Sequence, residues 1–61
     1  MKPTLEDIML AFGAMRAAAH IECARNPALG IAINERIARA HLAARSGYVQ
    51  RAYAILTGDV P

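Results

Sequence analysis

Two short breaks divide the chain into three segments whose apolar residues have helical spacing. Asn26-Pro27 forms the first break, because the residue before a proline is disfavoured in the α conformation, and Ser46-Gly47 forms the second. Within the segments apolar residues recur every three or four positions, and no stretch alternates apolar and polar residues as a half-buried strand does. The sequence therefore predicts one all-α domain covering residues 1–61, a compact three-helix bundle with helices at about residues 4–25, 27–45 and 48–57.

Local start signals support these boundaries. Thr4 and Asp7 match a capping box, in which the threonine hydroxyl accepts the amide three residues on and the carboxylate accepts the amide of the cap. Pro27 suits the first position of the second helix, where no amide donor is needed. Gly30 weakens that first turn, so the sequence leaves two starts open for the second helix, Pro27 and Asn34.

The first two segments each carry two apolar stripes on opposite sides when they are drawn as helices with about 100° per residue. In the first segment, the main stripe comprises Leu5, Ile8, Phe12, Met15, Ala19 and Cys23. The opposite stripe comprises Leu10, Ala14, Ala17 and Ile21. In the second segment, the main stripe comprises Leu29, Ile33, Ile37, Ala40 and Ala44, and the opposite side carries Ile31, Ala38 and Leu42. The third segment has one broad apolar side, made by Tyr48, Val49, Ala52, Ile55 and Leu56.

A bundle of three helices has a single interior, so the two opposite stripes exceed what one chain can bury. We expect them to be covered by a twofold homodimer or by a protein partner, and the sequence leaves open which. The predicted dimer or partner-binding residues are Leu10, Ala14, Ala17, Ile21, Ile31 and Leu42. The alternative is that these stripes are simply exposed, because alanines scattered over a surface have little consequence.

The chain is slightly basic, and its positive charge comes almost entirely from arginine. The net charge is +2, and six of the seven basic residues are arginines. The guanidinium group suits phosphates, carboxylates and stacked contacts. We expect Arg36, Arg39 and Arg45 to form a basic rim that steers an anionic partner. The alternative is an ordinary solvated face.

The sequence offers little support for catalysis or metal binding. His20 and Cys23 are three residues apart, a spacing that can place two metal ligands side by side, with His41 as a third candidate. However, Cys23 falls on the main apolar stripe, where a small buried hydrophobe is expected. Ser46 is the only serine, and no acid–base pair is placed near it. We therefore predict that the protein is not an enzyme and that it has no catalytic residue, metal or cofactor.

Residues 39–58, RAHLAARSGYVQRAYAILTG, resemble the helix-turn-helix of DNA-binding repressors. Ala43 matches the small residue at which the two helices touch, and Gly47 matches the turn glycine. The core positions of the motif correspond to Leu42, Tyr48, Tyr53 and Leu56. The resemblance implies that the second helix of the motif enters the major groove. In that arrangement Gln50 and Arg51 would read bases, while Arg39 and Arg45 would contact phosphates.

These observations favour a small non-enzymatic helical module that binds and modulates a larger protein or nucleoprotein assembly, and the size suits a bacterial or phage accessory protein. The alternative is a small helix-turn-helix transcriptional regulator that binds DNA. A single cysteine fits a reducing compartment, so we expect a cytoplasmic location. Glu6 and Asp7 stand where a signal peptide would be positively charged. No uncharged run approaches the ~18 residues of a membrane span, so no membrane partner is expected.

Overall fold

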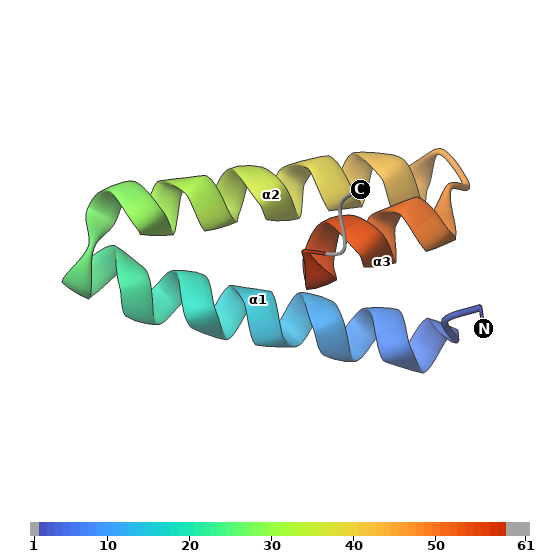
Figure 1. Cartoon of the computed structure of the whole chain (residues 1–61), viewed down its shortest axis with the longest axis horizontal. Helices are drawn as coiled ribbons and strands as arrows, with labels where there is room; N and C mark the ends of the chain where they lie inside the picture. The colour runs from blue at the N-terminus through green and yellow to red at the C-terminus, as the bar shows by residue number, and fades with distance from the viewer. Residues whose placement is uncertain (1, 59–61) are drawn as a thin grey trace.

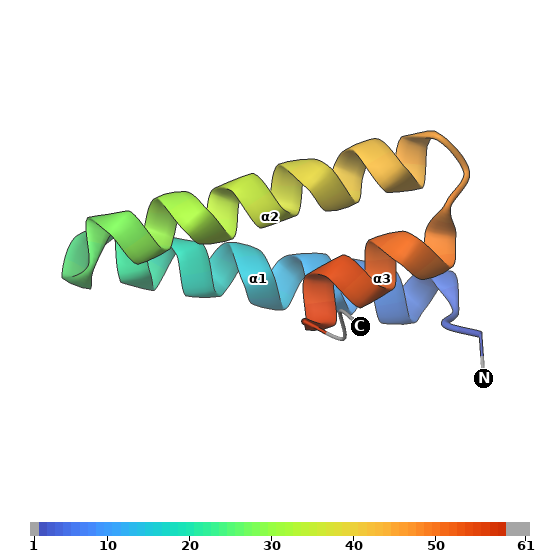
Figure 2. The same ribbon diagram turned by 45° about the horizontal axis from the view of Figure 1, so that its top comes forward.

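The computed structural model describes residues 2–58 and contains three helices: α1 (Leu5–Arg25), α2 (Pro27–Arg45) and α3 (Val49–Thr57). The long helices α1 and α2 form an antiparallel hairpin, and α3 folds back alongside the half of the hairpin that lies near the N-terminus (Figure 1). Figure 2 shows the same arrangement from a second direction. The predicted all-α three-helix bundle is confirmed, with α3 beginning one residue later than expected.

The starts of α1 and α2 are each capped by a side chain. The Asp7 amide donates to Thr4 Oγ1 at 3.1 Å, and the Thr4 amide donates to Asp7 Oδ2 at 2.9 Å, which completes the capping box. At the start of α2, the Leu29 amide donates to Asn26 Oδ1 at 3.4 Å. Pro27 occupies the first helical position. Of the two starts left open by the sequence, α2 therefore uses Pro27, and Asn34 lies inside the helix.

The turn between α2 and α3 is a Schellman motif, a helix end closed by backbone hydrogen bonds around a left-handed residue. The Tyr48 amide donates to the Ala43 carbonyl at 2.9 Å, and the Gly47 amide donates to the Ala44 carbonyl at 3.1 Å. Gly47 has φ of +89°, a conformation that glycine adopts without steric cost. The predicted role of Gly47 as the helix-ending residue is confirmed.

The core forms where all three helices meet. Its buried apolar residues are Ile8, Phe12, Ala19, Ile37, Ala40, Ala52 and Leu56. Ala40 of α2 and Ala52 of α3 are both 0% exposed, so small side chains allow these helices to lie close together. On α3, Ile55 is partly buried, but Tyr48 and Val49 are exposed, in contrast to the broad apolar side that the sequence predicted to be buried.

The main stripe of α1 is buried along its centre but not along one edge. Leu5 is 74% exposed, and Cys23 is also exposed, although the sequence predicted both on the buried stripe. The two residues are separated by five helical turns and therefore lie on the same line along α1. Ala11 and Met15, at the other edge of the stripe, pack against the core instead. The core is thus rotated around α1 relative to the prediction, because α3 packs on one side of the hairpin.

Gly30 permits the close approach of α1 and α2 just after their connection. This glycine is buried, and a Cβ atom added to it would lie 2.6 Å from Cys23 Sγ and 2.9 Å from both Cys23 Cα and Cys23 N. Two of these three contacts involve backbone atoms, which cannot rotate away. The sequence suggested that Gly30 weakens the first turn of α2, whereas its structural role is to let the two helices touch.

Candidate interaction surfaces

The outer face of α1 carries the apolar stripe that was predicted to bind a partner or a second copy. Leu10 is 66% exposed and Ile21 is 53% exposed, and Ala14 and Ala17 between them are also exposed. These four residues follow one another at spacings of four, three and four, which places them on one side of α1. That side is opposite to the buried residues of the helix. We call these four residues, together with Glu6 and Arg25 on the same line of the helix, the α1 outer face.

The outer side of α2 also remains apolar and exposed. Ile31 is 58% exposed and Leu42 is 66% exposed, with Ala38 exposed between them. Near the end of α2, Leu42 lines a hollow of about 290 Å³ between α2 and α3. We call this feature the α2–α3 hollow, and its principal lining residues are Arg39, Leu42, Ala43, Tyr48, Arg51 and Ile55. The structure therefore brings one predicted apolar anchor together with two of the predicted arginines.

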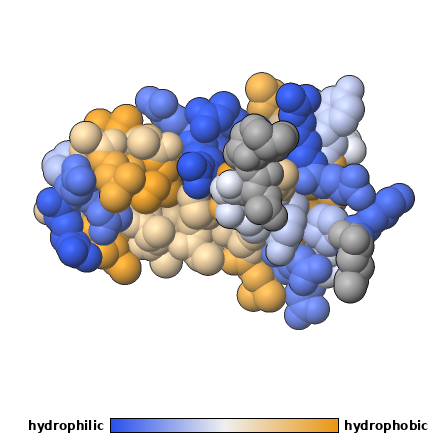
Figure 3. All heavy atoms as spheres, viewed as in Figure 1, coloured by the Kyte–Doolittle hydropathy of each residue, from blue (hydrophilic) through white to orange (hydrophobic). Residues whose placement is uncertain are grey.

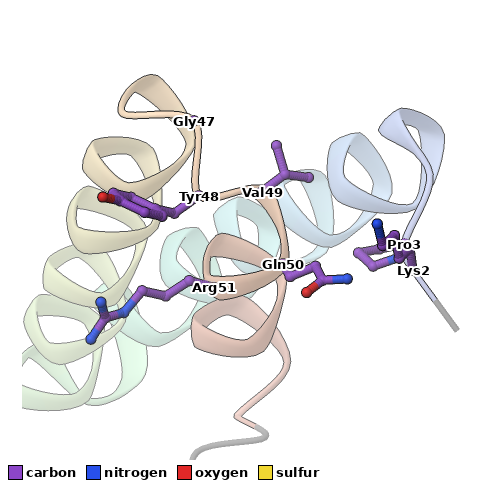
Figure 4. Close-up of a pocket in the computed structure, with 7 residues that line it drawn as sticks. All are labelled: Lys2, Pro3, Gly47, Tyr48, Val49, Gln50 and Arg51. Atoms are coloured by element: carbon purple, nitrogen blue, oxygen red, sulfur yellow. The ribbon is translucent and has the colours of Figure 1, made fainter.

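The start of α3 presents two different polar surfaces. Arg51 and Tyr48 extend on one side of α3, toward α2, whereas Gln50 extends on the other side, next to Lys2 and Pro3 (Figure 4). Adjacent residues on a helix diverge by about 100°. The predicted base-reading residues Gln50 and Arg51 both line a second hollow beside the N-terminal segment, and Arg51 also lines the α2–α3 hollow.

The arrangement of α2 and α3 differs from the one expected for a helix-turn-helix. In that motif the two helices cross at roughly 90–120°, whereas α3 folds back along α2 in both views (Figures 1 and 2). Leu42 and Tyr48, which the resemblance placed at core positions, are 66% and 62% exposed. Those two core assignments are wrong, because the residues on either side of a tight antiparallel turn face outward here. Tyr53 and Leu56 do pack in or against the core.

Of the three arginines predicted to form a basic rim, Arg36 and Arg39 are three residues apart and occupy neighbouring positions on α2, whereas Arg45 is turned away from them. Arg36 is half-buried and lies beside the hollow near the α1–α2 connection, and Arg39 lines the α2–α3 hollow. Arg45 is exposed, and it follows Arg39 by six residues, which rotates it by about 120° around α2. Arg39 also lines the α2–α3 hollow together with Arg51.

A polar row fills the groove between α1 and α2 on one side of the hairpin. The ring of His41 stacks on Phe12, with centroids 4.3 Å apart and planes inclined by 27°. Arg16 lies over the same phenylalanine ring, 5.9 Å from its centroid, and its Nη2 is 3.4 Å from His41 Nε2. These contacts assign His41 a packing role, in which it covers the edge of the core.

The candidate metal ligands do not converge. Asn34 Nδ2 donates to Cys23 Sγ at 3.9 Å, and His20 lines a shallow hollow with the same two residues. Within residues 2–58, no three His, Cys, Asp or Glu side chains lie close enough to share a metal ion. Cys23 was predicted to be a small buried hydrophobe and is instead exposed, because it lies at the uncovered edge of the α1 stripe.

One apolar surface was missed by sequence reasoning. On the face seen in Figure 3, apolar surface gathers over the end of the hairpin that α3 does not reach. A hollow there is lined by Met15, Leu29, Ala32, Ile33 and Arg36, and Leu29 is 43% exposed. The signal was present in the segment lengths, because a nine-residue helix cannot cover a hairpin of 21- and 19-residue helices along its full length.

Two further findings bear on the class of protein. Neither long helix, nor any other helix in the described part of the chain, combines the length and the apolar character needed to cross a membrane. Comparison of the chain with protein-family models, with curated proteins and with solved structures finds no match. The function must therefore be argued from the surfaces themselves.

Proposed function

We propose that the protein is a non-enzymatic helical interaction module that acts in the cytoplasm, where it binds and modulates a larger protein or nucleoprotein assembly. The observation that supports this proposal is the exposure of large apolar side chains on the outer sides of both long helices. Leu10, Ile21, Ile31 and Leu42 are each more than half exposed. Contiguous apolar surface on a small protein commonly marks a place where another molecule binds.

The α2–α3 hollow is the surface best suited to a foreign protein. Leu42, Tyr48 and Ile55 supply apolar contact area around it, and Arg39 and Arg51 supply positive charge. Tyrosine and arginine are the residue types that most often dominate binding energy at interfaces. We propose that this hollow, extended along α2 toward Ile31, receives an amphipathic helix with acidic residues along its edge.

Two equally exposed leucines provide a matched test. Leu42→Glu places a charge in the α2–α3 hollow, whereas Leu10→Glu places the same charge on α1, and both leucines are 66% exposed in the wild type. Each variant is immobilised and exposed to an extract of the source cells, and the captured proteins are quantified by mass spectrometry. We expect one set of proteins to be captured by the wild type and by Leu10→Glu but lost with Leu42→Glu. Equal capture by all three forms would contradict the proposal.

DNA binding is the second candidate function, and one observation favours it. Arg39 and Arg51 lie around the same hollow, and Lys2 and Gln50 lie around the adjoining one, so basic and amide groups from three parts of the chain gather near the α2–α3 turn. Such a cluster can contact phosphates.

Fluorescence anisotropy of a mixed-sequence DNA duplex, measured over a series of salt concentrations, separates the two candidates. A DNA-binding protein would bind with an affinity that falls steeply with salt, and the slope would count its phosphate contacts. Arg51→Ala would reduce that slope by about one, whereas Leu42→Glu would be the more damaging change for a protein partner. Absence of binding at low salt would remove DNA from consideration.

A further inference from the structure

The α1 outer face has nearly the same order of side-chain types when it is read from either end. The sequence of residues along this line is Glu6, Leu10, Ala14, Ala17, Ile21 and Arg25. From each end, a charged residue is followed by a large apolar residue and then by an alanine. All six residues are exposed. The two ends differ in one respect, because the first charge is negative and the last is positive.

We infer that the α1 outer face binds the α1 outer face of a second copy of this chain, with the two helices antiparallel. In this register Leu10 faces Ile21 of the second copy, and Ala14 faces Ala17. The alanines at the centre allow the helix axes to approach closely.

Charge complementarity selects a second copy in this orientation. An antiparallel twofold pair places Glu6 of each chain opposite Arg25 of the other. Two Glu6–Arg25 ion pairs then flank the apolar centre. A parallel pair would instead place Glu6 opposite Glu6 and Arg25 opposite Arg25. In coiled coils, charges that flank an apolar seam choose partner and orientation in the same way.

The symmetry of the pattern distinguishes a second copy from a foreign partner. A twofold interface uses the same patch on both chains, so the patch must be complementary to itself. The α1 outer face meets this requirement at three positions from each end, whereas a foreign partner imposes no such condition. Arg25 remains available for the contact, since its side chain is 75% exposed and its ion pair with Glu22 is a long 3.6 Å.

The size of the contact sets the expected affinity. The paired strip from Glu6 to Arg25 is about 29 Å long and one helix, about 10 Å, wide. This footprint is smaller than that of standard specific interfaces and falls in the range of weak, transient contacts. We therefore expect a weak dimer with a dissociation constant on the order of 100 μM, in which the charged ends influence both orientation and affinity.

Charge reversal at the two ends tests the register by sedimentation equilibrium. Glu6→Arg alone puts arginines at both ends of the face, and Arg25→Glu alone puts glutamates at both ends. Each variant should therefore self-associate at least ~10-fold more weakly than the wild type. An equimolar mixture of the two variants restores opposite charges at both contacts, so it should dimerise about as tightly as the wild type. A mixture that associates no better than its components would overturn the inference, as would a wild type that stays at the 6.5 kDa monomer mass at millimolar concentration.

A second pair of variants guards against loss of folding. Leu10→Glu inserts a charge into the apolar part of the α1 outer face and should give a monomer with an unchanged helical circular dichroism spectrum. Leu42→Glu, at an equally exposed position on α2, should dimerise like the wild type. Dissociation by Leu42→Glu rather than by Leu10→Glu would show that any dimer uses another surface. Either failure would leave the proposed partner surface on α2 and α3 untouched, since the two proposals rest on different residues.

Discussion

The contact between Gly30 and Cys23 predicts that two glycine-to-alanine substitutions have opposite effects on stability. Alanine is favoured over glycine in a helix by about 1 kcal/mol, so either substitution gains that amount from propensity alone. At Gly13 an added Cβ meets nothing within 4 Å, and the gain should be realised in full. At Gly30 the added Cβ would lie 2.9 Å or less from Cys23 Sγ, Cα and N.

The steric cost at Gly30 exceeds the gain in helix propensity. Overpacking of a well-packed contact costs about 1–3 kcal/mol. The upper part of that range applies here, because the backbone of Cys23 cannot move aside without separating α1 from α2. We therefore expect Gly30→Ala to lower the free energy of unfolding by about 2 kcal/mol after the gain of about 1 kcal/mol from propensity is subtracted. For a chain of this size, that loss lowers Tm by about 15 °C.

Thermal and urea unfolding, followed by circular dichroism at low micromolar protein concentration, measure both substitutions. Gly13→Ala should raise Tm by about 8 °C, and Gly30→Ala should lower it. The low protein concentration keeps self-association from contributing to the comparison. If Gly30→Ala is as stable as Gly13→Ala, the two long helices do not approach each other as closely as described, and the account of the hairpin is wrong.

Three further substitutions test the caps and the core by the same unfolding assay. Thr4→Ala removes the hydroxyl that accepts the Asp7 amide and should cost about 1 kcal/mol; Thr4→Ser should cost little, and equal losses in both variants would contradict the capping role. Leu56→Ala truncates a side chain that is 3% exposed and should cost about 2–5 kcal/mol, enough to unfold much of so small a chain; a loss below about 1 kcal/mol would mean that α3 does not pack as described. His41→Ala removes the ring stacked on Phe12 and should cost about 1 kcal/mol, most of it recovered by His41→Phe.

The local signals in the sequence predicted the helices well. Thr4, Asn26 and Gly47 act through their own backbone neighbourhood, so their roles depend little on how the helices pack. The period of the apolar residues likewise identified Ile8, Phe12 and Ile37 as buried. The same period placed Leu10 and Leu42 on opposite sides of their helices from the core, where the structure exposes them.

The features that depend on packing between helices could not be read from the period. The period does not say on which side of the hairpin α3 packs, and this choice exposes Leu5 and Cys23. It also does not show that Gly30 stands against Cys23, since that contact joins two helices. The grouping of Arg39 with Arg51 arises because α3 folds back along α2, and a helix-turn-helix crossing would have placed the same residues differently.

Site-specific photo-crosslinking shows directly whether the exposed apolar surface around Leu42 binds another protein. A photoreactive amino acid is introduced at Leu42 and, as a control, at His20, which is exposed beside the polar groove of α1 and α2. The labelled proteins are irradiated in the source cells, and the masses of the adducts are measured. We predict a discrete adduct to a larger protein from position 42 and none from position 20. Adducts of equal yield from both positions, or none from position 42, would contradict the claim.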